Sequence, residues 1–124
     1  MKRDKPNNVV PRLQSEIDAA VSLLSPAWEW GRPVKGYVVS SGRGKSYMTQ
    51  RSISVPEWAY DKGSGYFLYY VAHELAHILS YSVHHDYRFY KIFMEICPVE
   101  FQGHELGYKP SAKNYGIPPV KPGK

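Results

Sequence analysis

Apolar side chains recur at helical spacing in three segments of the chain. Since positions three and four apart share one face of a helix, we expect helices over about 11–25 and 65–82, and a third that Asp86 caps and Pro98 ends. The residues that carry the three patterns are Leu13, Ile17, Ala20, Val21 and Leu24; Phe67, Leu68, Val71, Ala72, Leu75, Ile78 and Leu79; and Phe89, Ile92, Phe93 and Ile96.

Two shorter segments between the first and second helices are typical of strands. Residues 36–41 and 46–55 are rich in β-branched and aromatic side chains, and Gly42-Arg43-Gly44-Lys45 separates them. We therefore expect a β-hairpin or small sheet here. Combined with the helices, it predicts a small α+β fold.

Length and composition indicate one compact domain. The chain has 124 residues, 43% of them hydrophobic, which is enough for one core but not for two. We expect the domain to cover residues 11–108, with flexible tails at 1–10 and at the Pro- and Lys-rich 109–124. Without a long apolar run or a secretory signal, the protein is expected in the cytoplasm and not in a membrane. Cys97 is the single cysteine, so no internal disulfide can form and we expect a buried thiol.

One internal stretch carries basic side chains without any acidic residue. The formal net charge is +5, and residues 30–56 contain five basic side chains but neither Asp nor Glu. Such a patch is typical of a solvated face or of a surface that attracts phosphates. We take Arg43, Lys45 and Arg51 as candidate nucleic-acid contacts, and DNA as a candidate partner.

Four of the five histidines lie within residues 69–85, two of them in the arrangement His73-Glu-Leu-Ala-His77. On a helix these two share one face, and Glu74, about 100° around the axis, can reach a metal-bound water rather than the metal. Zinc in such a site takes three protein ligands and lowers the pKa of a bound water towards about 7, while a carboxylate removes the proton. The spacing therefore predicts a zinc hydrolase. The alternative is a helix whose polar face carries these side chains in solvent.

A third ligand must come from beyond the helix. On a continued helix, position 84 would lie about 10 Å from His77 along the axis, too far for a shared ion. Because the helical pattern fades before His84 and a new helix begins after His85, the chain can turn back at this corner. Glu95 is a further alternative, although Lys91 four residues earlier favours a solvated ion pair.

These residues resemble a known family. His73-Glu-Leu-Ala-His77 followed by His85-Asp-Tyr-Arg-Phe89 is similar to the SprT-like metallopeptidases, in which an H-E-x-x-H helix precedes a histidine four residues before an aromatic. Ser52-Ile-Ser-Val-Pro56 looks like the strand and turn that lead into that helix. The resemblance covers residues 11–97 and extends to short phage-encoded members.

The resemblance implies a zincin-like domain and a zinc-dependent endopeptidase. His73, His77 and His85 would be the Zn²⁺ ligands, Glu74 the general base and Phe89 a packing residue. The substrate would be a protein or peptide, with DNA-associated proteins as candidates, and the location the host cytoplasm for a phage-encoded protein.

The chain departs from the family pattern at the third ligand and after the last helix. Asp86 replaces the common Gly, His84 adjoins His85 as an alternative ligand, and the sequence has no C-terminal Cys-rich zinc ribbon. Tyr81, one turn after His77, is a candidate oxyanion stabiliser. His104-Glu105 begins like the metal motif but Tyr108 replaces its second histidine, so we assign no site there.

Two other functions remain open at this stage. In one, zinc only holds the helices together, and the fourth position is closed by a protein ligand such as His84. In the other, the basic segment binds nucleic acid and the metal site has no catalytic role.

Overall fold

The computed structural model describes residues 6–26 and 32–106. In these residues five α-helices and a three-stranded sheet form an α+β fold, which confirms the expected class. In chain order the elements are a 3-10 turn at Pro11–Leu13, α1 (Gln14–Leu24), β1 (Lys35–Val39), β2 (Lys45–Tyr47), β3 (Ser52–Pro56), α2 (Glu57–Asp61), α3 (Ser64–Ser80), α4 (Tyr87–Ile96), a 3-10 turn at Val99–Phe101 and α5 (Gly103–Leu106).

The strands pair differently from the expected hairpin. Their order is β1-β3-β2, with β1 parallel and β2 antiparallel to β3. The hairpin is therefore formed by β2 and β3, because a turn at 48–51 divides the segment predicted as one strand, and Arg51 there has a left-handed φ of 52°. The central place goes to β3, which is buried throughout, while the more polar β2 takes an edge.

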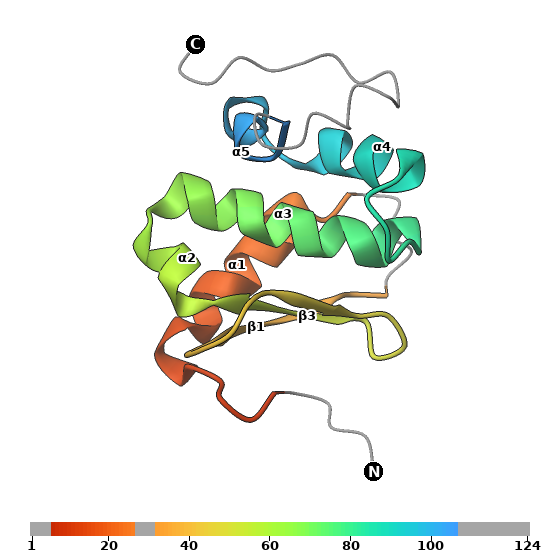
Figure 1. Ribbon diagram of the computed structural model, residues 1–124. Coiled ribbons are helices and arrows are strands. Elements are labelled where there is room, and N and C mark those ends of the chain that lie inside the picture. Colours follow the sequence, from red (N-terminus) through yellow and green to blue (C-terminus); the bar gives the residue numbers. More distant parts are fainter. Residues whose placement is uncertain (1–5, 27–31, 107–124) are drawn as a thin grey trace.

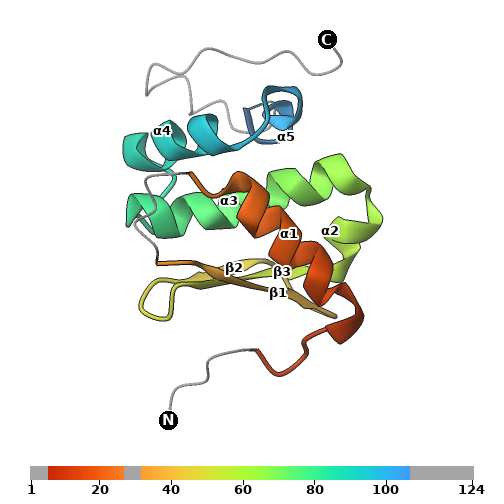
Figure 2. The same cartoon turned by 180° about the vertical axis from the view of Figure 1, so that it is seen from behind.

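The helices form two layers above the sheet. Helices α1 and α3 cover the same face of the sheet, and α4 and α5 lie on the side of α3 that faces away from the strands (Figures 1 and 2). Helix α3 is thus enclosed between the sheet and α4, which explains why nine of its residues are buried. This central position brings segments from both ends of the domain against the same helix.

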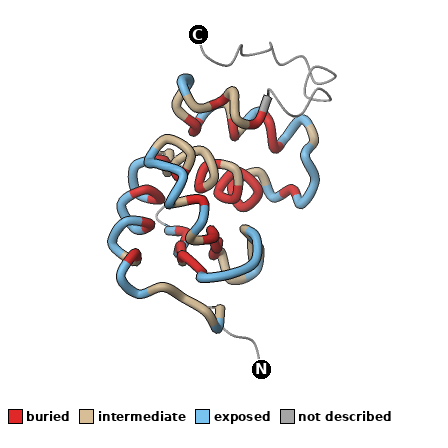
Figure 3. The backbone as a smooth tube through the Cα atoms, turned by 60° about the vertical axis from the view of Figure 1, so that its left-hand side comes forward, coloured by how far each residue is buried: buried red, intermediate tan, exposed pale blue. Residues whose placement is uncertain are grey.

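The core occupies the space between these layers. Buried positions gather in the middle of the molecule, and exposed positions follow its outer side (Figure 3). The predicted apolar stripes are confirmed at the core: Ile17, Val71, Leu75, Ile78, Phe89 and Phe93 are all fully buried. Cys97 is a free buried thiol, as the sequence predicted.

Residues 8–10 near the N-terminus contact the sheet. Val9 forms an antiparallel bridge with Val39, the Val10 amide donates to the Val38 carbonyl, and the Asn8 side-chain amide donates to Ser41. Residues 8–10 of the expected tail thus pair with the end of β1 and the residues that follow it. Residues 1–5 and the predicted tail at 109–124 lie outside the described residues. Within the described ranges, no helix combines the length and apolar character that crossing a bilayer requires.

Candidate metal centre

Helix α3 ends in a way that allows the chain to reverse towards its own face. Tyr81 adopts a left-handed conformation with φ 55°, and its amide donates to the carbonyls of His77 and Ile78. The Ser82 amide also donates to the His77 carbonyl, at 3.2 Å. These bonds form a Schellman-type ending, which satisfies the last helical carbonyls and redirects the chain. The predicted corner is therefore present.

The corner brings three histidines together. One ligand atom from each of His73, His77 and His85 lies within 4.8 Å of the other two. The Nε2 atoms of His73 and His85 are 3.1 Å apart. Three imidazoles around zinc, with bonds of about 2.1 Å at tetrahedral angles, have nitrogens about 3.4 Å apart. The triad therefore fits a single metal ion of this kind.

Hydrogen bonds fix how two of these rings face the site. His77 Nδ1 lies 2.8 Å from the Ser82 carbonyl oxygen, and His73 Nδ1 lies 2.8 Å from Glu105 Oε1. Since a carbonyl and a carboxylate accept, each Nδ1 carries the proton and each Nε2 keeps its lone pair. Burial lowers the pKa of His77 to about 4. The neutral imidazole that a metal needs is therefore the favoured form.

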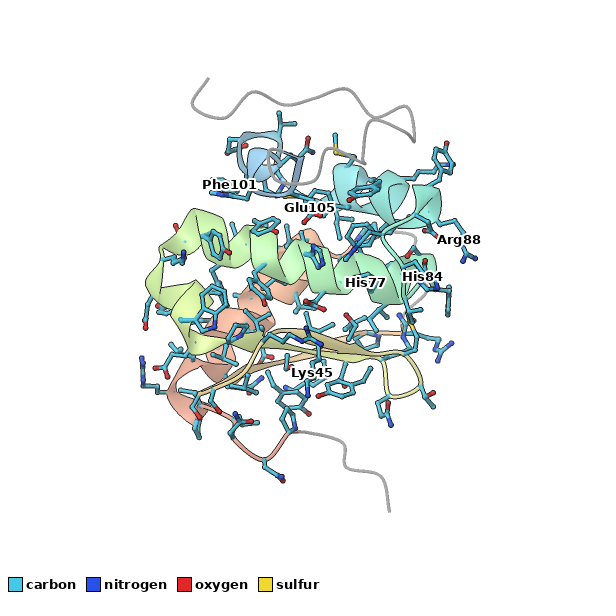
Figure 4. All side chains as sticks on the ribbon, in the orientation of Figure 1. Lys45, His77, His84, Arg88, Phe101 and Glu105 are labelled. Carbon is cyan, nitrogen blue, oxygen red and sulfur yellow. The ribbon has the colours of Figure 1, made fainter. Side chains whose placement is uncertain are left out.

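The loop that carries His85 is held by Ser82 and Asp86. The Ser82 hydroxyl lies 3.0 Å from Asp86 Oδ2 and accepts from the His84 amide at 3.3 Å. Asp86 Oδ1 accepts from the Phe89 amide, which confirms the predicted N-cap of α4. His84 is exposed at the corner between α3 and α4 and is not part of the triad (Figure 4). The geometry thus favours His85 over His84.

Phe89 forms an apolar floor beneath the triad. Its ring centroid lies 4.5 Å from that of His77 and 5.0 Å from those of His73 and His85. The side chain is fully buried. The spacing of four residues between His85 and Phe89 therefore has a structural reason: His85 lies just before the N-cap of α4 and Phe89 lies in the first turn of that helix, where the two rings are in contact.

The Glu74 carboxylate lies between α3 and the edge strand β2. It is only 7% exposed, and Ser46 Oγ approaches its Oε1 to 2.7 Å and its carbonyl oxygen to 2.9 Å. Burial raises the pKa of Glu74 above its ordinary value, although the charge of His73 and the Ser46 hydrogen bond act the other way. A carboxylate with a raised pKa is a stronger base, as its predicted role requires.

Gly44 allows this close approach of strand and helix. A Cβ on Gly44 would lie 2.7 Å from Glu74 Oε2 and 2.3 Å from Tyr70 Cε1, and the Gly44 amide donates to the Tyr70 hydroxyl at 2.9 Å. We expect Gly44→Ala to displace both side chains. The substitution should lower the free energy of unfolding by about 1–3 kcal/mol, measured by urea denaturation, and should also reduce any activity that depends on Glu74.

Gly36 provides the matched control for this prediction. A Cβ there would lie 2.7 Å from Ile17 Cγ1 on α1, so Gly36→Ala introduces a comparable clash against α1. It should lower stability without a specific effect on activity. If Gly44→Ala had wild-type stability and activity, Gly44 could not pack against Glu74 as described.

Glu105 is the functional residue that the sequence did not reveal. It is fully buried on α5 and contacts His73, although we assigned no site to His104-Glu105. The local sequence around a single acidic residue in a short helix does not show that this residue will be buried. Ser46 was also missed as a partner of Glu74, because this contact joins a strand to a helix 28 positions away.

Several other predicted residues have different surroundings from those expected. Tyr81 ends α3 instead of extending its ligand face, and it is 66% exposed, so its suggested oxyanion role has no support. Glu95 is exposed and does not belong to the histidine triad.

The three candidate nucleic-acid contacts differ in their surroundings. Arg43 and Lys45 are exposed, whereas the Arg51 guanidinium donates to the Arg32 carbonyl at 2.6 Å. Arg51 is therefore the weakest of the three candidate nucleic-acid contacts.

Comparisons with known proteins give no relative on which to base a function. Neither a family model, nor a curated protein, nor a solved structure matches the chain. Any functional conclusion therefore depends on the chemistry of the metal centre itself.

Proposed function

We propose that this protein is a zinc-dependent endopeptidase whose metal ligands are His73, His77 and His85. The observation that carries the proposal is the convergence of three imidazoles, one of which, His73, is followed in the chain by the buried carboxylate of Glu74 and acts on it electrostatically. Three protein ligands leave one position of a tetrahedral ion for water, which is the arrangement of catalytic and not of structural zinc sites. His84, the expected candidate for closing that position, is not in the triad.

Each side chain has a defined task in such a reaction. A zinc ion bound here would lower the pKa of a coordinated water and polarise the carbonyl of the substrate. The hydrogen bonds at Nδ1 of His73 and His77 keep their Nε2 atoms directed into the site. Glu74 accepts the proton from the attacking water and passes it to the leaving amine, and its raised pKa suits both transfers.

A peptide substrate is favoured by the resemblance to SprT-like metallopeptidases. Arg43 and Lys45 are exposed on either side of Gly44, and the charge of Arg43 acts on Glu74, so basic charge lies close to the proposed base. This charge is consistent with substrates that are bound to DNA or are themselves acidic. We therefore include DNA-associated proteins among the proposed substrates.

The direct test is cleavage of an unfolded protein by the zinc-loaded chain. We expect new peptide termini in mass spectrometry, loss of cleavage when a chelator removes the metal, and recovery when zinc is restored. Parallel reactions with added DNA would show whether nucleic acid stimulates cleavage. A fully zinc-loaded protein that cleaves no peptide bond under any of these conditions would instead favour a structural metal site.

A further inference from the structure

We infer that Glu105 is a positioning residue that holds His73 in its metal-binding orientation, so that the short C-terminal helix α5 is part of the metal centre. This inference rests on the proposed function, because it assigns Glu105 a role only if His73 binds a metal. Glu105 comes from α5 and reaches the space next to α3 (Figure 4). In sequence it lies 32 positions from its histidine partner.

The contacts of Glu105 are those of a group that orients a ligand. Oε1 accepts from His73 Nδ1 at 2.8 Å and from the Tyr69 hydroxyl at 3.0 Å, and the Tyr90 hydroxyl lies 3.5 Å from Oε2. His73 therefore has one nitrogen bound to the carboxylate and the other, Nε2, beside His85. In metal sites, a carboxylate that accepts from the distal N–H of a histidine ligand fixes the ring and increases its basicity.

The burial of Glu105 also needs an explanation. Its side chain is 0% exposed, and an isolated carboxylate in such surroundings would be very unfavourable. Hydrogen bonds from His73 and Tyr69 instead stabilise the buried carboxylate, and one of these two partners is a metal-ligand candidate.

The segment before α5 keeps Glu105 in place. The Gln102 side-chain amide is buried and donates to the carbonyls of Met94 and Cys97 at 3.1 and 2.9 Å. These bonds fasten the start of α5 to the end of α4. Because α4 also carries Phe89 under the histidines, both the floor of the site and the support of His73 depend on the same element.

The experiment compares zinc affinity, by competition with a chromophoric chelator, in four full-length proteins: wild type, Glu105→Gln, Glu105→Ala and Glu100→Gln. The Gln variant keeps the shape and one acceptor oxygen but removes the charge. We expect its zinc affinity to fall by roughly 10-fold, and that of the Ala variant by up to about 100-fold. Glu100 is exposed on the same segment, so its Gln variant is the charge-matched control and should bind zinc like the wild type.

Two further measurements separate positioning from a purely structural role. Thermal unfolding of the metal-free proteins reports on the fold, and the visible spectrum of the cobalt-substituted proteins reports on ligand geometry. We expect Glu105→Gln to change the cobalt spectrum as well as the affinity. Wild-type zinc affinity in Glu105→Gln would overturn the inference, whatever its unfolding temperature.

A His73→Ala variant measured in the same series distinguishes this inference from the proposed function. If His73→Ala loses zinc while Glu105→Gln does not, only the role of Glu105 is wrong. If His73→Ala keeps wild-type affinity, both the metal centre and the positioning role are overturned.

Discussion

Glu74→Gln is expected to leave zinc bound and the fold intact while reducing peptide cleavage by at least about 10²–10⁴-fold, the usual contribution of a general acid–base group. Gln has nearly the same shape, so the Ser46 hydroxyl can still donate to its side-chain oxygen. The substitution removes the proton acceptor and little else. Cleavage of an unfolded protein, zinc content and thermal unfolding should be measured for both forms.

The matched control for this variant is Ser46→Ala, which removes the partner of Glu74 and keeps the carboxylate. It should lower activity far less than Glu74→Gln, because the base itself remains. Loss of zinc from Glu74→Gln would make Glu74 a metal ligand and the proposed mechanism wrong. Equal cleavage by Glu74→Gln and the wild type would show that another group, or a contaminant, is responsible.

His85→Ala is expected to weaken zinc binding by more than the roughly 10–100-fold that is typical of a lost outer-sphere partner, because it removes one of only three protein ligands. His84→Ala changes the neighbouring residue and should bind zinc nearly as the wild type does. Both side chains are exposed at the same corner, so the pair is closely matched. Affinity is measured by chelator competition.

The ligand assignment would be contradicted if His84→Ala lost more zinc affinity than His85→Ala. A larger loss in His84→Ala would mean that the corner rearranges around the metal. Equal, small losses in both would place the third ligand elsewhere in the chain, and His73→Ala and His77→Ala would then show whether the first two ligands are correct.

The three longer helices, α1, α3 and α4, and the triad could be predicted from sequence because their signals are local, whereas the short α2 and α5 were not predicted. The spacing of His73 and His77 defines a shared helical face, and Asp86 marks the start of the next helix by capping the Phe89 amide. Because only a few residues separate the end of the active-site helix from this cap, His85 must lie close to His73 and His77. The spacing to Phe89, first noted as a family resemblance, corresponds to direct ring contacts with all three histidines.

The strand pairing and the support of the ligands depend on tertiary contacts that no local pattern records. The central strand β3 is buried throughout although it contains two serines, so neither its central place nor its parallel pairing with β1 could be predicted from the composition of the strands. Glu105 reaches His73 only because Gln102 anchors α5 to α4. Ser46 reaches Glu74 because the edge strand β2 passes beside α3.

The most direct test of the metal centre is a crystal structure of the zinc-loaded protein with anomalous data collected on both sides of the zinc edge. We expect one anomalous peak, within about 2.1 Å of Nε2 of His73, His77 and His85, with solvent in the fourth position within reach of the Glu74 carboxylate. A peak elsewhere, or a fourth position closed by a protein side chain such as His84, would contradict the proposal of a catalytic zinc site.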